Sequence, residues 1–343
     1  MFALIVRRIF FSIPILLLLT LMLFWAVKLV PGDAAVVMAG ERATPEKIAH
    51  IREMLHLNDA WYVQYGLYLK KLVLNFDLGT SLFHDQPISR LLATAVPATV
   101  ELGFFALLIA VPVGVLLGIL GAVYRNKFID KLASATAIAG VSMPIFWLAL
   151  VLMYFFSIKW GLLPTSGRMS DEILFDPATE SYTNMYTLDG FIRGITGKGW
   201  EVFGYALRHI ALPALALSTI PMAQICRITR SAFLEVLAQD FVRTAHAKGL
   251  SAKTVLFKHV FRNASLQIVT ISMLQAGNIF GGAVITETMF SWPGLGKVLV
   301  ESIASRDFPM VQSGTLFVGF MFVMFSLAAD VLYGVLDPRL ARK

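Results

Sequence analysis

Few side chains in this sequence are of the types that catalyse reactions or bind metals, and those few are far apart. The single cysteine, Cys226, lies in an apolar run and is interpreted as a small packing residue. The histidines have no spacing typical of a metal site: they are His50, His56, His84, His209, His246 and His259. Gly197 and Lys198 lack the earlier glycine and the following Ser or Thr of a phosphate-binding loop. The sequence therefore predicts no catalytic residue, no metal site and no ATP site on this chain.

The composition indicates a protein whose main solvent is lipid. Of the 343 residues, 57% are hydrophobic and 15% are charged, whereas about 25% are charged in a typical soluble domain. One cysteine excludes an intramolecular disulfide. The net charge of +7 could indicate a nucleic-acid partner, so its distribution along the chain decides the interpretation.

Six uncharged stretches are long enough to cross a bilayer, which needs about 20 apolar residues in a helix. They are Ile9–Val27, Leu102–Tyr124, Leu132–Ile158, His209–Cys226, Asn263–Thr286 and Phe308–Ala329. The fourth is the shortest and contains Pro213 and Pro221, so it is the least secure span. The first exceeds the apolar run of a cleaved signal peptide, so we expect it to be retained. The predicted class is an all-α integral membrane protein with six transmembrane helices.

The positive charge follows membrane topology. If Arg7 and Arg8 are cytoplasmic, the segments on the same side are 124–131, 227–262 and 330–343. These segments are rich in Lys and Arg, as the positive-inside rule requires, and the external segments are not. We therefore expect both termini in the cytoplasm and no nucleic-acid partner.

Two long external segments are expected. Residues 31–93 contain two amphipathic helical patterns, one starting at Thr44 with Pro45 and Glu46 in its first turn, and one from Trp61 to Leu72. Residues 159–208 are rich in Gly, Asp, Thr and Ser and are predicted to form an irregular cap.

The cytoplasmic loop 227–262 has the strongest local pattern. A helix over Ser231–Leu237 is followed by a short helix from Asp240 to Lys248, which Gly249 ends as a C′ glycine. Ser251 can cap a further helix that runs to Phe261. This pattern predicts a stiff projection from the membrane surface.

The small Ala245 and Ala247 lie beside Arg243 and Lys248 on the short helix. Small side chains permit close docking of a partner, and basic ones can pair with an acidic rim. The residues alone leave open that this is merely a basic cytoplasmic loop.

The segment DFVRTAHAKGL at 240–250 resembles the cytoplasmic motif of ATP-binding-cassette importer permeases. Gly249 aligns with the motif glycine, while Arg243 stands where the wider family has Glu, as in the dipeptide, oligopeptide and nickel branch. The later I-x-L-P end is not matched at 259–262, and the proline that often follows Arg-Asn-Ala in this branch is missing after Arg262.

Further motifs extend the resemblance from about residue 5 to residue 340, and together they are most similar to dipeptide permeases. They are Val30–Asp33, Met38–Arg42, Val141–Trp147, Leu163–Arg168, Gly281–Gly296 and Arg306–Pro309.

This resemblance implies one half of a type I importer in the bacterial inner membrane, moving dipeptides or short peptides. It implies a second homologous permease, two cytoplasmic ATPase subunits and a periplasmic substrate-binding protein as partners, with ATP and Mg held by the ATPases and no cofactor on this chain. The domains would be a first helix at 1–30, a periplasmic segment at 31–93, a permease domain at 94–332 and a cytoplasmic tail at 333–343. Nickel chelates or other small solutes are the alternative cargo.

Three candidate sites follow. The resemblance implies an ATPase-coupling helix formed by Asp240, Phe241, Arg243, Thr244, Ala245, Ala247, Lys248, Gly249, Leu250 and Ser251. Polar or small residues that can line a translocation path on the fifth span are Gln267, Thr270, Gln275, Asn278 and Gly281. A periplasmic gate or docking element, or simply a structural turn, is expected at Glu287, Trp292, Pro293 and Gly294. Glu101 and Asp330, at span edges, are expected to be solvated at the interface.

Two other classes remain as alternatives. A secondary transporter would have inverted repeats and buried ionisable groups in its spans, and neither is clear in this sequence. A membrane enzyme would need a constellation of nucleophile and base or of metal ligands, and none is visible.

Overall fold

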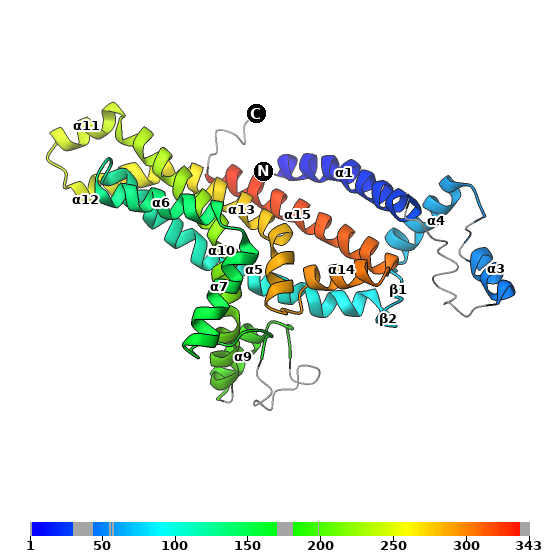
Figure 1. Ribbon diagram of the computed structural model, residues 1–343. Coiled ribbons are helices and arrows are strands. Elements are labelled where there is room, and N and C mark those ends of the chain that lie inside the picture. Colours follow the sequence, from blue (N-terminus) through cyan, green and yellow to red (C-terminus); the bar gives the residue numbers. More distant parts are fainter. Residues whose placement is uncertain are drawn as a thin grey trace. The chain divides into compact units, whose positions relative to one another are not determined.

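The computed structural model describes residues 2–29, 44–54, 56, 58–169, 181–197 and 199–336. These residues are mostly helical (Figure 1), which confirms the predicted all-α class. The only strands among them are β1 (Thr80–Ser81) and β2 (Gln86–Pro87), which pair antiparallel with Thr80 opposite Pro87. The motifs expected at Val30–Asp33 and Met38–Arg42 and residues 337–343 of the tail lie outside the described residues.

The chain divides into two compact units. Unit 1 consists of Met1–Arg8, Ala95–Lys297 and Met321–Lys343, and unit 2 of Ile9–Thr94 and Val298–Phe320. The long helices are α1 (Phe2–Leu29), α5 (Ile88–Val123), α10 (Trp200–Leu237), α13 (Phe261–Met289) and α15 (Phe308–Leu336). The shorter ones are α3 (Pro45–Met54), α4 (Trp61–Leu74), α6 (Phe128–Ser142), α7 (Ile145–Leu152), α9 (Tyr186–Ile195), α11 (Asp240–Ala247), α12 (Ala252–Thr254) and α14 (Leu295–Ala304), with π-helical turns η1 (Met153–Lys159) and η2 (Val255–Val260).

Four helices are long and apolar enough to cross a membrane among the described residues, or up to six spans if each of two bent helix pairs counts as one. The expected third span is one of these pairs, because α6 and the α7–η1 helix meet at 106°. The bend lies at Met143, whose backbone is extended at φ −81° and ψ 125°. Pro144 disfavours helical backbone in the residue before it, so the span predicted over 132–158 is a bent pair of helices and not one continuous helix.

The expected fifth span is also bent, by 51° between Ile279 and Ala283. Gly281 stands within this break, and glycine is a common cause of helix kinks. The expected fourth span, by contrast, belongs to α10, the longest helix described at 38 residues. Both of its prolines lie inside α10 and are buried, as neighbouring helices permit in membrane proteins.

Helix α10 is the centre of unit 1 and packs closely against α5. A Cβ atom at Gly114 would lie 2.7 Å from the Met222 carbonyl oxygen, and one at Gly118 would lie 2.7 Å from that of Cys226. Small residues let helices approach in this way where lipid supplies no hydrophobic drive. Of the most apolar 18 residues of α10, 67% are buried within the chain, against 6% for α1.

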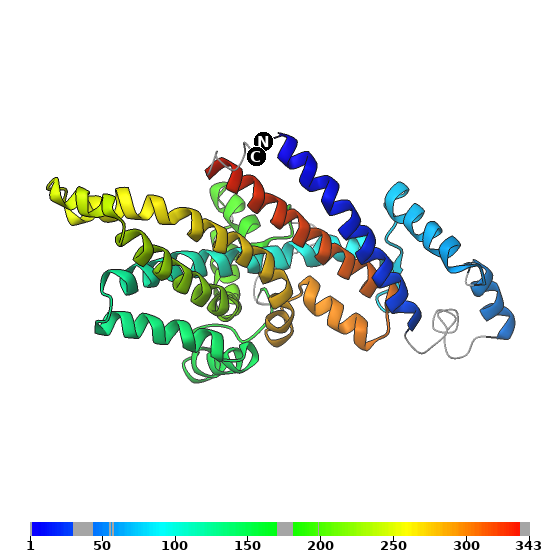
Figure 2. The ribbon, with the colours of Figure 1, turned by 90° about the horizontal axis from the view of Figure 1, so that it is seen from above.

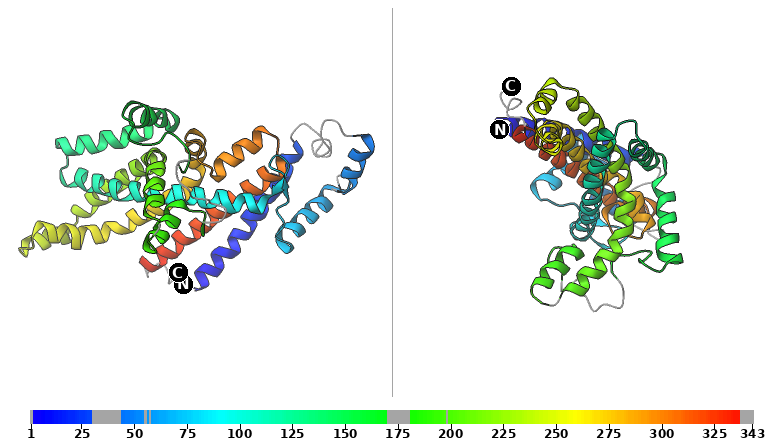
Figure 3. Two further views of the ribbon diagram at one scale, coloured as in Figure 1. Left: turned by 90° about the horizontal axis from the view of Figure 1, so that it is seen from below. Right: turned by 90° about the vertical axis from the view of Figure 1, so that its left-hand side faces the viewer.

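A shared core joins α5, α10 and α13 toward the α9 end of α10. Its buried members are Ala98, Leu102, Ala106, Ile210, Ala214, Leu217, Ile279, Ala283 and Trp292. The right-hand view of Figure 3 shows α9 and α11 at opposite ends of α10. These two ends carry the candidate sites.

The structure corrects the predicted irregular cap at 159–208. Its described part contains α9 and the first turns of α10, and α9 packs on α10 through Gly190 and Gly194. The buried Asp189 carboxylate organises the segment before α9, because it accepts hydrogen bonds from the Thr183 amide at 3.0 Å and the Thr183 hydroxyl at 2.8 Å.

Unit 2 contains both amphipathic helices predicted in the segment 31–93, as α3 and α4. The Tyr65 hydroxyl of α4 lies 2.8 Å from the Thr20 hydroxyl of α1 and fixes α4 against it. The Asp307 carboxylate is fully buried and accepts hydrogen bonds from the Ser81 hydroxyl and from the Phe83 amide. It thereby fastens the β1–β2 hairpin to the turn before α15.

Candidate functional site

The short helix α11 ends as the sequence predicts. Gly249 has φ +77°, its amide donates to the His246 carbonyl at 2.9 Å, and the Leu250 amide donates to the Ala245 carbonyl at 3.3 Å. This pair of bonds is a Schellman motif. The Ser251 hydroxyl accepts from the Thr254 amide at 3.3 Å and caps the next helix. In Figure 2 the chain then runs back beside the end of α10.

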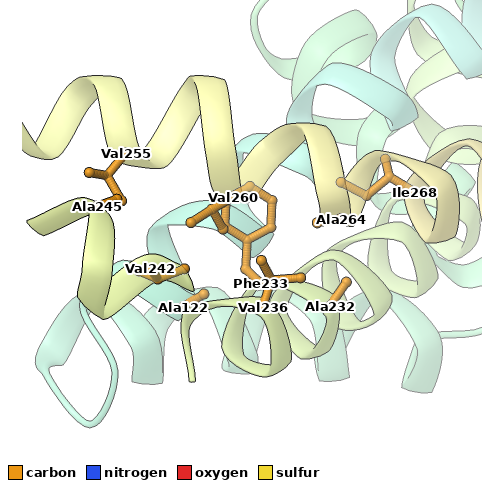
Figure 4. Close-up of a cluster of buried hydrophobic side chains, with 10 residues drawn as sticks. All are labelled: Ala122, Ala232, Phe233, Val236, Val242, Ala245, Val255, Val260, Ala264 and Ile268. Atoms are coloured by element: carbon orange, nitrogen blue, oxygen red, sulfur yellow. The ribbon is translucent and has the colours of Figure 1, made fainter. Parts of the chain in front are cut away.

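One face of α11 packs into the chain's own core. Val242 and Ala245 are buried against Phe233 and Val236 of α10 and Val255 of η2 (Figure 4). We define residues 231–262 as the α11 hairpin. Because Ala245 faces this core, its small size serves packing within the hairpin, which corrects the expectation that it lies open to a partner.

The opposite face of α11 is exposed. The predicted coupling residues on it, or in the turn after it, are Asp240, Phe241, Arg243, Thr244, Ala247, Lys248, Gly249, Leu250 and Ser251. Phe241 and Leu250 are large apolar side chains with 37% and 38% of their surface exposed. The exposed Lys248 lies on the same part of the chain, and Arg243 pairs with Asp240 at 3.6 Å. Exposed apolar side chains with charged neighbours are suited to docking a partner.

An ion pair that could not be predicted from the sequence, Asp130 with Arg230, lies directly before the α11 hairpin. The Arg230 guanidinium of α10 donates to both carboxylate oxygens of Asp130 on α6, from Nε at 2.7 Å and from Nη2 at 2.9 Å. The side chain of Asp130 is 7% exposed and that of Arg230 is 32% exposed. This bidentate geometry is the strongest form of the pair.

The predicted path residues divide between two faces of α13. Gln267, Asn278 and Gly281 are exposed and Thr270 is half-buried, whereas Gln275 is buried. The residue that continues the exposed face in place of Gln275 is Leu274. Four of the five residues therefore share the accessible face.

At the other end of α10, residues 287–296 form a turn that we call the Trp292 turn. The Glu287 carboxylate is fully buried and accepts from the Thr99 hydroxyl at 2.6 Å and from the Lys297 amide at 3.0 Å. A Cβ atom at Gly294 would overlap this carboxylate, and one at Gly296 would lie 2.8 Å from its Oε2. The glycines therefore make room for the acid.

Of the four predicted gate residues in this turn, Glu287, Trp292 and Gly294 are buried. The indole Nε1 of Trp292 donates to the Ala98 carbonyl at 2.9 Å, and the ring is buried. Trp292 thus anchors within the protein and not at a membrane interface. Pro293 is exposed and stands apart from the hydrogen bonds of Glu287.

A buried ion pair joins α5 to the loop after η1. Arg168 donates to the Glu101 carboxylate, and both residues are buried, which corrects the expectation that Glu101 is solvated at an interface. The guanidinium also lies 3.8 Å from the ring centre of Tyr186 in α9. Burial raises the pKa of the Tyr186 phenol, and the Arg168 charge opposes that rise. Sequence reasoning found the motif containing Arg168 but not its partner.

The comparisons with known proteins agree over nearly the whole chain. Residues 114–342 match the family of binding-protein-dependent transport system inner membrane components, and residues 1–103 match the N-terminal part of such membrane components. The chain belongs to this permease family.

Three relatives of the permease match along nearly their full lengths. The dipeptide transport system permease protein DppB of Alkalihalophilus pseudofirmus is 44% identical over 340 residues, covering 99% of both chains. The protein of the same name in Escherichia coli is 42% identical, covering 99% of this chain and 98% of that one. A di/tripeptide transport system permease of Pseudomonas aeruginosa is 41% identical over 341 residues, covering 99% of both.

The permease is a multi-pass protein of the bacterial inner membrane and a transport subunit, not a catalytic one. Within the described ranges, no group of three His, Cys, Asp or Glu side chains could hold a metal ion. Its two candidate regions are the exposed face of the α11 hairpin and the buried network around the Trp292 turn.

Proposed function

We propose that this permease carries dipeptides and other short peptides across the inner membrane as part of an ATP-driven importer. The observation that carries the proposal is the identity of 41–44% to three permeases named for dipeptide or di/tripeptide transport, over 99% of this chain. The motifs at 240–250 and 281–296 lie within residues 114–342, which match the family model.

The proposed assembly contains a second homologous permease, two cytoplasmic ATPases that hold ATP and Mg, and a periplasmic substrate-binding protein. In this assembly the chain has a type I importer fold with six spans, each bent pair counting as one, and both termini in the cytoplasm. The excess of Lys and Arg in 124–131 and 227–262 supports that orientation.

The α11 hairpin is proposed to couple this chain to an ATPase. Its inner face is fixed by Val242 and Ala245, so the helix projects as a rigid body. Its outer face offers the half-exposed Phe241 and Leu250, with Lys248 beside them. Closure of the ATPases would draw the hairpins of the two permeases together and shift the assembly between inward-open and outward-open states. The exposed face of α13 would line the path, and the Trp292 turn would lie at its periplasmic end.

The transport proposal is tested by reconstituting the complete complex in proteoliposomes. Uptake of a labelled dipeptide should need ATP and the loaded binding protein, and should exceed uptake of a nickel chelate under the same conditions. Uptake of the chelate without uptake of any dipeptide or tripeptide would overturn the proposed cargo.

The coupling proposal is tested at Ala247, which is exposed on the outer face. Ala247→Asp places a charge on that face without disturbing the hairpin core, so it should release the ATPases and abolish uptake. The matched control is Ala60→Asp, an exposed alanine at the start of α4, which should keep both. Normal ATPase retention and uptake in the Ala247 variant would contradict the coupling role.

A further inference from the structure

Four separate segments meet at the buried Arg168 guanidinium. It pairs with Glu101 of α5 and donates to the Asn184 carbonyl at 2.8 Å. Its carbon Cζ lies 3.8 Å from the ring centre of Tyr186 and 5.2 Å from that of Trp292. One side chain therefore contacts α5, the segment before α9, α9 itself and the Trp292 turn.

The partners of Arg168 are also bound to one another. The Oε1 atom of Glu101 accepts from the Thr187 amide at 2.7 Å and from the Thr187 hydroxyl at 2.6 Å. Directly before Arg168, the Gly167 amide donates to the Phe290 carbonyl of the Trp292 turn at 3.0 Å. The contacts form a closed network, in which no segment can leave without breaking bonds to two others.

Because both charges are buried, opening one contact of this network is energetically costly. Arg168 and Glu101 are 6% and 3% exposed, and separating a buried pair leaves each charge without compensation. The planar guanidinium serves two aromatic rings and two acceptors at once, which the single ammonium group of lysine cannot do.

We propose that Arg168 is a positioning residue that holds α5, α9 and the Trp292 turn as one rigid body throughout the transport cycle. The turn then opens only when the whole body moves, and substrate passes only when ATP drives that movement. This inference rests on the proposed function, because it concerns the tightness of coupling in the same importer.

The test is the number of peptides transported per ATP hydrolysed by the complete complex in proteoliposomes. Arg168→Lys keeps the charge opposite Glu101 but loses the stacking on Tyr186, so this ratio should fall roughly fivefold or more. The control is Arg208→Lys, because Arg208 is exposed and donates from Nη2 to the Leu162 carbonyl at 3.0 Å; its ratio should stay within about twofold of the parent. If uptake and hydrolysis fall together in Arg168→Lys and the ratio is unchanged, Arg168 is only structural and the inference is overturned.

A second measurement uses the unmodified complex and does not depend on a variant that folds. Amide hydrogen exchange is compared between the nucleotide-free complex and the complex trapped with ATP. A rigid body keeps residues 185–195 and 287–296 equally protected in both states. Loss of protection in either segment in one state would overturn the inference, whereas absence of peptide uptake by the unmodified complex would count against the proposed function instead.

Discussion

The two ends of α10 place their charged side chains in opposite ways. At the α9 end, two acids and an arginine are buried, because Glu101, Arg168 and Glu287 are each at most 6% exposed. The two carboxylates accept hydrogen bonds, and the Arg168 guanidinium donates to Glu101 and to the Asn184 carbonyl. At the α11 end, the interior is apolar and the charged side chains face outward. The first arrangement fixes segments of the same chain, and the second leaves charges available for a different chain.

The α9 end is held by buried polar contacts, and the α11 end by an apolar core. Buried polar contacts are directional and specify one arrangement of distant segments, at the risk of a large penalty when one partner is removed. The apolar core of the α11 hairpin tolerates changes of its outer face, because Val242 and Ala245 point away from that face. Substitutions at the α9 end should therefore strongly lower the free energy of unfolding. At the α11 end, the loss should depend on whether the substituted residue faces the core or the outer face.

The largest effect is expected for Gly294→Ala. The added methyl group would overlap the buried Glu287 carboxylate, so the carboxylate must leave its donors or the turn must shift, at a cost of at least about 3 kcal/mol. The control is Gly204→Ala in α10, where nothing lies within 4 Å of the added atom. The purified complex should lose thermal stability only in the first variant. Equal midpoints of thermal unfolding would show that the turn is loosely packed.

The two ion pairs give the next contrast. Glu101→Gln leaves the Arg168 charge buried without its counterion, which should cost about 3–5 kcal/mol. Asp130→Asn should cost only about 1–2 kcal/mol, because the side chain of Arg230 is 32% exposed and water can solvate it. Thermal unfolding of the two variants side by side measures the difference. A larger loss for Asp130→Asn would reverse the comparison between the two ends.

Within the α11 hairpin, substitution by leucine should change the free energy of unfolding differently at Ala245 and at Ala247. Ala245→Leu overfills the core beside Val255 (Figure 4) and should cost about 1–3 kcal/mol. Ala247→Leu adds the same volume to an exposed position and should leave the free energy of unfolding within about 0.5 kcal/mol. Proteolysis of the hairpin distinguishes the two variants, and equal cleavage rates would mean that Ala245 is not a core residue.

The α11 hairpin could be predicted because its determinants are local. Gly249 and Ser251 end one helix and start the next within a few residues, and both act as predicted. The α9 end could not be assembled in the same way, since Glu101 and Arg168 are 67 residues apart and Trp292 and Ala98 are 194 apart. Position at a span edge suggested a solvated Glu101, because nothing in a single sequence names its partner.

The spans show a second limit of the sequence. A helix that faces lipid on most sides is apolar all round, and such a helix is easily predicted from its composition. Helix α1 is of this kind, since only 6% of its apolar stretch is buried within the chain. The fourth span is the least secure in the sequence because it is the shortest and contains Pro213 and Pro221, yet it belongs to the longest helix described, and 67% of the apolar stretch of α10 is buried within the chain. Pro144 was visible in the sequence, yet the apolar residues on both sides concealed the 106° bend it permits.

The smallest effect separates backbone strain from contact in the α11 hairpin. Nothing lies within 4 Å of a Cβ atom at Gly249, so the cost of Gly249→Ala comes from φ +77° alone and should be about 1 kcal/mol. Asparagine tolerates this conformation better, so Gly249→Asn should recover part of the loss. Local amide exchange at residues 248–250 reports the change without requiring global unfolding. If the alanine and asparagine variants are equally impaired in ATPase retention, the defect arises from a side chain at the docking surface, and Gly249 contributes to the partner interface as well as to the turn.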